Sequence, residues 1–314
     1  MTCLAVLEPG LLTTVQDLGR YGYLRYGIPP SGPMDREAFI LANRLLGNPD
    51  TAAGLECTLI GPKLEVRAAC LVAVTGAEMP LAVNDREAPR WSAVSLKAGD
   101  VLRLATAKAG ARAYLAVSGG IDVPPVLGSR ATYLRGQLGG LEGRQLRKGD
   151  LLPLGRPQAS PEASDGRRVR AECIPSYSAE PEVRVVLGPQ AHRFTREGIA
   201  AFLEGPYEVL PQSDRMGARL RGPRITHTEG HDIISDGIPL GGIQVVGDGQ
   251  PIVLLIDRQS TGGYTKIATV CSFDIGRVAQ LRPGQRLRFR SVSLGEAHAA
   301  LRLERGRLDA AVVR

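Results

Sequence analysis

One segment of the sequence places several polar side chains directly after an apolar, strand-like run at residues 252–256. They comprise one acid, two bases, an amide and several hydroxyl groups beside a Gly-Gly pair: Asp257, Arg258, Gln259, Ser260, Thr261, Tyr264 and Lys266. Cationic and neutral donors next to a flexible glycine pair are suited to bind a carboxylate or a phosphate. The same residue types also cap one another in ordinary turns. Composition alone leaves an anion site and an elaborate turn as equal alternatives.

A second polar, glycine-containing region covers residues 13–22 and 30–35. Gln16, Asp17 and Arg20 provide there the same amide, acid and arginine types as the first segment. Such an acid and arginine can contact a substrate, or they can form a buried structural ion pair, and both uses are common. This region is therefore the second candidate site.

Other kinds of chemistry lack their sequence motifs. The chain has no Gly-x-x-x-x-Gly-Lys-Ser/Thr loop and no Gly-x-Ser-x-Gly elbow, so neither a P-loop nor that type of serine hydrolase is expected. His227 and His231 are four residues apart, but the glycine between them predicts a loop rather than a helix, and we expect no metal site. The five cysteines form no Cys-x-x-Cys pair, which favours free thiols, with Cys57 and Cys271 buried.

Composition and charge limit the class of partner. The formal net charge is +7, yet the basic residues are spread along the chain and aromatic residues make up only 4%, so we expect no nucleic-acid binding. No run of about 18 apolar residues occurs, so we expect no membrane span. The first ten residues lack a basic stretch before an apolar run, and together with the scattered cysteines this favours the cytoplasm.

Short apolar runs at residues 70–75, 113–117, 183–187 and 252–256, bounded by Gly, Pro or Asp, predict a β-rich chain. Three segments, 96–104, 146–154 and 281–289, share a Gly-centred turn that leads into an alternating strand. Helices are predicted at 33–46, at 190–203 and from Ser293, where Ser293 and Glu296 form a capping box.

The length of 314 residues favours two domains. Residues 155–168 are polar, proline-bearing and without periodicity, as expected of a linker. We therefore expect domains at 1–160 and 170–314 with a linker near 155–170. Copies of the glycine turn in both halves suggest that the halves are built alike.

Several long motifs resemble the biotin-dependent carboxyltransferase family, which includes allophanate hydrolase subunit 2 and the sporulation antikinase proteins. They are Val-Gln-Asp-Leu-Gly-Arg at 15–20, Ser-Gly-Pro-Met-Asp at 31–35, Ser-Asp-Gly-Ile-Pro-Leu-Gly-Gly-Ile-Gln at 235–244, and Asp-Arg-Gln-Ser-Thr-Gly-Gly-Tyr at 257–264. The resemblance runs in order over roughly residues 4–292. It implies a mainly β fold of two tandem cyclophilin-like β-barrel domains with a few short helices.

The resemblance also implies an activity. Stand-alone bacterial members look like the C subunit of an ATP-dependent 5-oxoprolinase, which opens the cyclic amide 5-oxo-L-proline to L-glutamate. It would act with a B subunit (antikinase-inhibitor-like) and an A subunit, and would use ATP with Mg²⁺ at the level of the complex. One alternative is the carboxyltransferase part of a urea carboxylase or allophanate hydrolase system, with biotin carried on another chain. The other is a non-catalytic, antikinase-type regulatory binding protein.

Both reactions need donors that stabilise developing oxyanion charge. On the matched motifs, that role falls to Arg258, Gln259, Thr261 and Tyr264, with Lys266 as a phosphate or carboxylate contact. Substrate binding falls to Gln16, Asp17, Arg20 and Asp257. Asp35 is expected to charge a helix N-terminus, and Asn43 and Glu56 to lie in buried polar networks.

Overall fold

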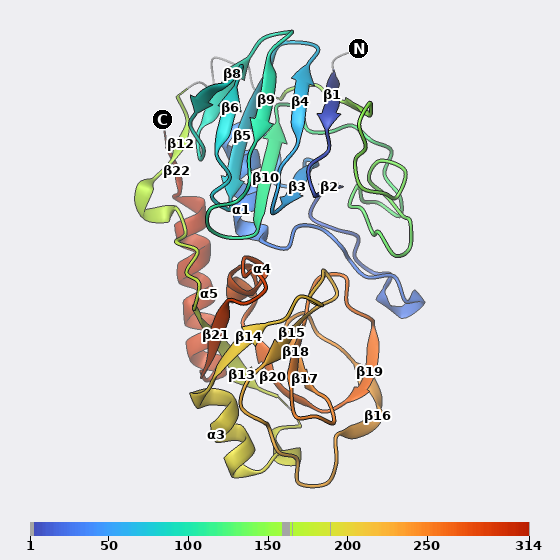
Figure 1. Cartoon of the computed structure of the whole chain (residues 1–314), viewed down its shortest axis with the longest axis vertical. Coiled ribbons are helices and arrows are strands. Elements are labelled where there is room, and N and C mark those ends of the chain that lie inside the picture. The colour runs from blue at the N-terminus through green and yellow to red at the C-terminus, as the bar shows by residue number, and fades with distance from the viewer. Residues whose placement is uncertain (1–2, 159–163, 165, 189, 314) are drawn as a thin grey trace. The chain divides into compact units, whose positions relative to one another are not determined.

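The computed structural model describes residues 3–158, 164, 166–188 and 190–313. The chain divides into two compact units (Figure 1). Unit 1 comprises Met1–Arg20, Ser31–Ser176 and Gly306–Arg314, and unit 2 comprises Tyr21–Pro30 and Tyr177–Arg305. The expected linker near 155–170 includes residues 159–163 and 165, which lie outside the described residues.

Unit 1 is built mainly from two antiparallel sheets, one of which packs against the helix α1. The six-stranded sheet has the order β11-β1-β4-β9-β6-β7, and the five-stranded sheet has the order β2-β3-β10-β5-β8. The bounds are β1 Cys3–Glu8, β2 Leu12–Gln16, α1 Arg36–Leu45, β3 Gly54–Thr58, β4 Lys63–Val66, β5 Cys70–Gly76, β6 Leu81–Val83, β7 Arg86–Ala88, β8 Ala93–Leu96, β9 Val101–Leu104, β10 Arg112–Val117 and β11 Leu151–Pro153. A short pair, β12 Arg168–Val169 and β22 Val312–Val313, completes it.

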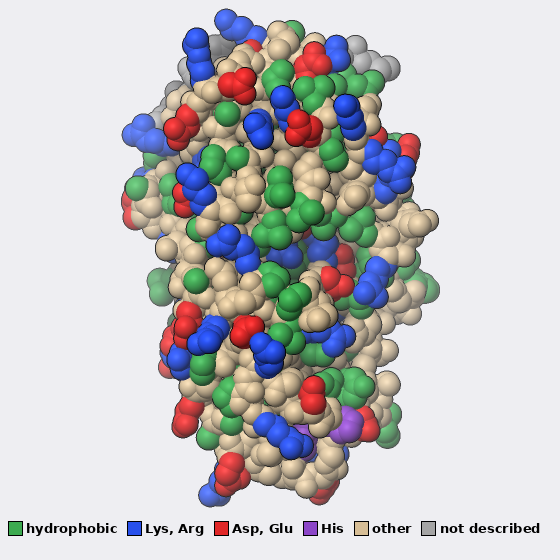
Figure 2. All heavy atoms as spheres, in the orientation of Figure 1, with side chains coloured by type: hydrophobic (Ala, Val, Ile, Leu, Met, Phe, Trp, Pro, Cys, Tyr) green, Lys and Arg blue, Asp and Glu red, His purple; other side chains and the backbone are tan. Residues whose placement is uncertain are grey.

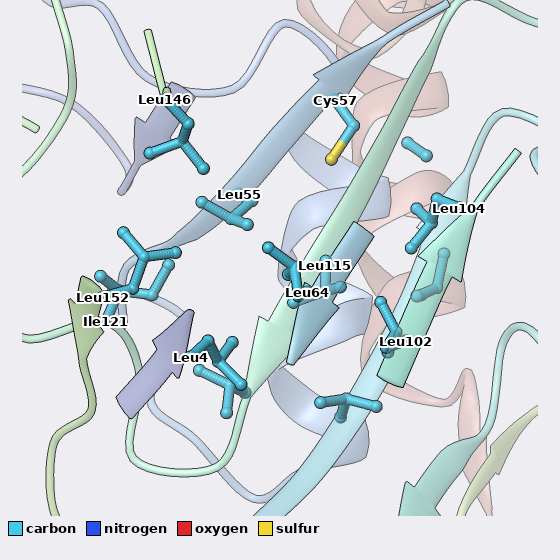
Figure 3. Packing of buried hydrophobic residues seen from close by; sticks show 14 of the residues in the cluster. Leu4, Leu55, Cys57, Leu64, Leu102, Leu104, Leu115, Ile121, Leu146 and Leu152 are labelled. Atoms are coloured by element: carbon cyan, nitrogen blue, oxygen red, sulfur yellow. The ribbon is translucent and has the colours of Figure 1, made fainter. Parts of the chain in front are cut away.

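The five-stranded sheet is buried on both faces. Side chains alternate across a strand, and Leu115 of β10 lies in one hydrophobic core with Cys57 and Leu64 (Figure 3). Val117 of β10 belongs to the same cluster. Tyr114 lies in the other cluster, with Phe39 of α1, and the two rings meet edge to face at 5.9 Å. This double burial explains why β5 and β10 are near-continuous apolar runs in the sequence.

Unit 2 is a closed barrel of seven strands in the order β13-β20-β17-β18-β15-β14-β21. The bounds are β13 Glu182–Leu187, β14 Pro206–Val209, β15 Gly217–Arg221, β17 Gly242–Val245, β18 Pro251–Leu254, β20 Lys266–Val270 and β21 Arg286–Ser291. The strands β13 and β21 close the barrel in parallel. A separate two-stranded ribbon consists of β16 Asp232–Gly237 and β19 Thr261–Tyr264. The mainly β fold expected from the sequence is confirmed, with a closed barrel in this half.

The helices agree with the sequence in two cases of three. In α1, Asp35 is the N-cap and accepts the Ala38 N–H at 3.2 Å, so the helix begins after Pro33 rather than at it. In α5, Leu294–Asp309, the capping box forms, because Ser293 N donates to Glu296 Oε2 at 2.7 Å and Glu296 N to Ser293 Oγ at 3.2 Å. α5 begins in unit 2 and ends in unit 1.

The single helix expected over 190–203 is wrong in its first third. The chain forms a short 3-10 turn at Ala191–Arg193 and only then α3, Arg196–Glu204. Phe194 is extended, and the Thr195 hydroxyl caps α3 by accepting the Gly198 N–H at 3.0 Å. A new N-cap therefore starts a new helix, as Thr commonly does. The short helix α4, Ile275–Ala279, follows β20 and was not indicated by the sequence.

The three glycine-centred turns share one geometry. Gly99, Gly149 and Gly284 have φ values of 90°, 90° and 85°. In each turn the next residue folds back onto the backbone. Asp100 accepts the Lys97 N–H at 2.7 Å, Asp150 the Arg147 N–H at 2.7 Å, and Gln285 the Arg282 N–H at 2.8 Å. The turn predicted from the sequence is confirmed in both units.

No helix among the described residues is long and apolar enough to cross a membrane. The five cysteines are free.

The turn geometry predicts opposite effects of one substitution at two glycines. Gly99→Ala places a Cβ at a positive φ with no neighbour to clash, so strain alone should destabilise the protein by about 1–2 kcal/mol. Gly306→Ala, in α5 and also without neighbours, should stabilise it by about 0.5–1 kcal/mol. Urea unfolding of both variants measures the difference, and equal shifts of the same sign would contradict this account of the turn.

Burial also predicts the reactivity of a thiol. Cys57 is fully buried among Leu55, Leu104 and Leu115, and burial raises the pKa of its thiol to about 12. At pH 8 only about one molecule in ten thousand then carries the reactive thiolate. Native Cys57 should therefore resist iodoacetamide for hours, as followed by peptide mass spectrometry, whereas the same residue in guanidinium-unfolded protein should react fully. Rapid labelling in the native state would contradict this placement.

Candidate functional site

The polar segment after β18 begins with a buried ion pair. Asp257 is 4% exposed, and its Oδ2 accepts Nε of Arg215 at 2.8 Å, while its backbone N–H donates to the Arg215 carbonyl at 2.9 Å. Arg215, just before β15, is also buried. The Asp257 carboxylate, expected to bind substrate, thus holds the loop before β15 against the end of β18.

Arg258 is buried and held by neutral oxygens. Its Nε donates to the Ile238 carbonyl at 2.9 Å and its Nη1 to the Leu255 carbonyl at 3.4 Å. Burial lowers the pKa of this guanidinium. Within the described ranges no carboxylate pairs with it. A buried cation held only by carbonyl dipoles keeps most of its capacity to attract an anion.

Three of the predicted catalytic residues lie on or beside the exposed ribbon. Gln259 precedes it, and Thr261 and Tyr264 are the first and last residues of β19. Tyr264 is 39% exposed, and its ring stacks on His231 with ring centroids 5.8 Å apart. Figure 2 shows histidine side chains at the molecular surface. These donors are accessible to solvent and to a ligand.

Lys266 begins β20 with its side chain buried. Among the described residues its Nζ has no hydrogen-bond partner, and it lies 3.4 Å from Oδ2 of Asp236 on β16. Its backbone N–H donates to Oε1 of Gln190 at 2.9 Å. Gln244 of β17 is opposite Lys266 in the ladder, and its Nε2 donates to the Tyr264 carbonyl at 3.5 Å. Barrel strands therefore hold Lys266 while the exposed ribbon supplies its counter-ion.

The residues predicted in the first half all lie in unit 1 and are buried. Gln16 donates from Nε2 to the Thr132 carbonyl at 3.2 Å and accepts the Gly32 N–H at 3.0 Å. The Asp17 carboxylate accepts the Ser129 hydroxyl at 2.5 Å and the Arg130 N–H at 2.6 Å.

Arg20 donates from Nη2 to the Ala131 carbonyl. The partners of the Asp17 carboxylate are the Ser129 hydroxyl and the backbone N–H groups of Gly19 and Arg130. In this unit Gln16, Asp17 and Arg20 hold the loop that carries residues 129–132.

The buried network expected around Glu56 is present. Glu56 Oε2 accepts the Met34 N–H at 2.8 Å and the Tyr114 hydroxyl at 2.9 Å, and that hydroxyl accepts the Asp35 N–H at 2.7 Å. Burial and the neighbouring carboxylates raise the pKa of Tyr114 well above its ordinary value. Asn43 donates to the Ala52 carbonyl at 2.9 Å.

The structure thus brings together, in unit 2, six of the nine predicted site residues around the end of β18, the ribbon and the start of β20: Asp257, Arg258, Gln259, Thr261, Tyr264 and Lys266. Sequence reasoning missed the partners Arg215, Gln190 and Asp236. Asp236 lies inside the motif at residues 235–244, so the sequence alone could have indicated it as a site residue. Arg215 and Gln190 carry no local signal, because their contacts depend on pairing that is distant in sequence.

On the face shown in Figure 2, Lys and Arg side chains are interspersed with Asp and Glu rather than gathered into one band. No group of three or more His, Cys, Asp or Glu side chains is arranged to hold a metal ion in the part of the chain that the structure describes. The site offered by unit 2 is therefore one of cations, amides and hydroxyls.

Residues 26–291 match the model of the family described as carboxyltransferase domain, subdomain A and B, and the chain belongs to this family. Among proteins of known role, it is similar to the 5-oxoprolinase C subunit of Escherichia coli, with 39% identity over 294 residues that cover 94% of this chain and 93% of that protein. It is also similar to the urea amidolyase of Lachancea kluyveri, with 35% identity over 92% of this chain but only 17% of that protein.

Among solved structures, the urea amidolyase of K. lactis superposes with a TM-score of 0.92 at 34% identity, covering 98% of this chain and 20% of that one. The chain thus spans about a fifth of the length of the urea amidolyases that it matches.

The Arg215–Asp257 pair predicts a large stability effect. Asp257→Ala leaves the Arg215 charge buried without its carboxylate, so the free energy of unfolding should fall by about 3–5 kcal/mol. Asp232→Ala is the matched control, because its carboxylate is 75% exposed beside His231, and it should change stability by less than about 0.5 kcal/mol. Equal losses in urea unfolding would show that the buried pair does not hold this loop.

Proposed function

We propose that this chain is the C subunit of an ATP-dependent 5-oxoprolinase, which opens the ring of 5-oxo-L-proline to L-glutamate. The observation that carries the proposal is the end-to-end likeness to the E. coli protein, 94% of one chain against 93% of the other. A second 5-oxoprolinase C subunit, from Haemophilus influenzae, is 35% identical over 93% of this chain and 92% of its own length. The urea amidolyases instead contain this region as a small part of a longer chain.

The chemistry of a cyclic amide defines what the site must supply. An amide is a poor electrophile, and transfer of the γ-phosphoryl group of ATP to its oxygen, with release of ADP, makes the ring carbon more electrophilic. Water then adds to that carbon, the C–N bond breaks as the nitrogen takes up a proton, and hydrolysis of the resulting acyl phosphate gives the carboxylate and inorganic phosphate. Charge develops on oxygen in these steps, and fixed donors in a site of low dielectric stabilise it most. Arg258 fits this requirement because it is buried and without a carboxylate partner among the described residues.

The accessible donors Gln259, Thr261 and Tyr264 can orient the ring, and Lys266 can contact a carboxylate or phosphate. ATP with Mg²⁺ would supply the phosphoryl group. The donor set of unit 2 fits the anionic end of such a group. The sequence has no P-loop, and so we place nucleotide binding at the level of a complex with A and B subunits. We also place the chain in the cytoplasm, where free cysteines such as these persist.

The second candidate is carboxyl transfer from biotin to a urea-type amide. It is favoured by the description of the family and by the TM-score of 0.92 with a urea amidolyase. Carboxybiotin would then arrive on another chain, and the same donors would stabilise the oxyanion of the amide that accepts the carboxyl group.

Reconstitution tests the two candidates. The chain is purified with candidate A and B subunits, and ATP-dependent release of glutamate from 5-oxo-L-proline is measured. Release that disappears when this chain is omitted supports the proposal. No release from an assembled, folded complex contradicts it, and carboxylation of urea by a biotinylated carrier together with this chain would support the second candidate instead.

Replacement of one arginine tests the catalytic assignment. Arg258→Ala removes a buried donor, and kcat of the reconstituted complex should fall by about 10²–10³-fold. Arg221→Ala is the control, because its side chain is 65% exposed and pairs with Glu208 on the barrel surface, and kcat should not change. Urea unfolding checks that both variants fold, and an Arg258→Ala complex with the activity of the unsubstituted one would refute the assignment.

A further inference from the structure

Two donors of unit 2 converge on a single oxygen atom. Lys266 Nζ and Gln190 Nε2 both lie 3.4 Å from Oδ2 of Asp236. An ammonium and an amide on one carboxylate oxygen are the usual contacts of a bound anion. A ligand carboxylate could occupy the position of the Asp236 carboxylate only if the two donors are fixed and Asp236 can move.

The two donors are held firmly. Lys266 has a side chain that is 4% exposed, on a strand paired to β13 and β17. The Gln190 amide is oriented because its Oε1 accepts the Lys266 backbone N–H at 2.9 Å, which turns Nε2 toward Asp236. These donors keep their positions whatever carboxylate they meet.

Asp236 is held by its own ribbon, where its Oδ1 accepts the Gly237 N–H at 2.6 Å. Its side chain is 56% exposed, and it lies on β16, which pairs only with β19 in the two-stranded ribbon of the described chain. Gly237 and Gly263 lie in the same ribbon, and glycine permits backbone rearrangement at little steric cost, whereas Gly262 lies closely against the Gln244 side chain of β17. The Gly237 N–H, and then Lys266, lower the pKa of Asp236, so the carboxylate is ionised near neutral pH.

The contact between the two charges is also long. A separation of 3.4 Å exceeds the roughly 2.7–2.9 Å of a charge-assisted hydrogen bond, and Lys266 Nζ has no hydrogen-bond partner in the described structure. A buried ammonium gains from a closer anion, because burial without full pairing is unfavourable. A small carboxylate able to reach Nζ directly would improve on Asp236.

We propose that Lys266 and Gln190 form a carboxylate subsite which Asp236 fills in the free chain, and that the carboxylate of a small-molecule ligand displaces Asp236 from it. Asp236 is then an internal competitor rather than a catalytic residue, and the ribbon moves away when ligand binds. This inference rests on the proposed function for the identity of the ligand, since 5-oxo-L-proline carries one carboxylate beside its ring amide.

Substitution of the competitor gives the decisive measurement. Titration calorimetry of the full chain with 5-oxo-L-proline is compared with Asp236→Asn, which keeps the size of the side chain and removes its charge. Relief of competition should tighten binding by about 2- to 5-fold, the range that an exposed ion pair typically contributes. Weaker or unchanged binding in Asp236→Asn would overturn the proposal, as would absence of binding in both forms.

Further arms identify the donors and the ligand group. Lys266→Met should weaken binding of 5-oxo-L-proline by at least about tenfold, and Gln190→Ala, which leaves the lysine in place, by severalfold. Urea unfolding separates loss of the site from loss of the fold, and Gln190→Ala provides the test if Lys266→Met does not fold. Unchanged binding in a folded Gln190→Ala variant would overturn the role of the amide.

The ring without its carboxylate, 2-pyrrolidone, should not bind measurably, and inorganic phosphate should bind more weakly than 5-oxo-L-proline. Tighter phosphate binding would overturn the choice of a carboxylate. These affinities are independent of turnover. Tighter binding in Asp236→Asn without glutamate release from the complex would support the subsite and refute the proposed activity. Glutamate release without tighter binding in Asp236→Asn would support the activity and refute the subsite.

Discussion

Burial of positive charge in the barrel of unit 2 is the constraint on which the site depends. A cation removed from water is destabilising unless other groups replace its hydration. Arg215 meets a buried carboxylate on Asp257 at 2.8 Å, Arg258 meets two backbone carbonyls, and Lys266 meets one exposed carboxylate at 3.4 Å. The three cations thus differ in how completely the protein itself compensates them. Arg258, which has no carboxylate partner among the described residues, and Lys266, whose carboxylate partner is exposed, are therefore better placed than Arg215 to contact a foreign anion.

The buried carboxylates Asp17 and Glu56 of unit 1, in contrast, have several hydrogen-bond donors each. Asp17 accepts hydrogen bonds from Gly19, Ser129 and Arg130, and Glu56 accepts them from Met34 and Tyr114. Donors within the same unit thus occupy both carboxylates at distances of 2.5–2.9 Å. Carboxylates whose oxygens already accept several hydrogen bonds hold the neighbouring loops in place, which is a structural role for Asp17 and Glu56. We therefore expect anion contacts in unit 2, where Arg258 and Lys266 have no buried carboxylate partner among the described residues.

The local sequence was sufficient to predict turns and helix caps, where one or two residues determine the backbone conformation. Gly99, Gly149 and Gly284 each adopt the positive φ that the turn motif required, and Ser293 and Glu296 form the capping box that their spacing indicates. The helix over 190–203 failed because an extended Phe194 and a capping Thr195 interrupt an otherwise acceptable helical pattern.

The sequence located a cluster of polar residues but not the partners of its members. The cluster from Asp257 to Lys266 is contiguous in sequence and remains together in the fold. The Asp257 partner, Arg215, is 42 residues away, and Gln190 reaches Lys266 across 76 residues. Those distances are spanned by the pairing of β15 with β18 and of β13 with β20, and barrel closure sets that register. A reading of the sequence alone therefore finds the donors and cannot say which of them is already engaged.

The division of labour between barrel and ribbon follows from their burial. Lys266 and Arg258 are buried beside barrel strands, so their charges have fixed positions, as stabilisation of developing charge requires. Thr261, Tyr264 and Asp236 lie on a ribbon of two strands with exposed side chains, which the Gln244–Tyr264 hydrogen bond and the close approach of Gly262 to Gln244 join to the barrel. Asp236 on the ribbon faces Lys266 on the barrel. An anion that replaces that carboxylate must therefore displace Asp236 and the ribbon that carries it. Because Tyr264 and Thr261 lie on the same ribbon, binding of that anion would also shift these two donors, which are expected to act on the ring.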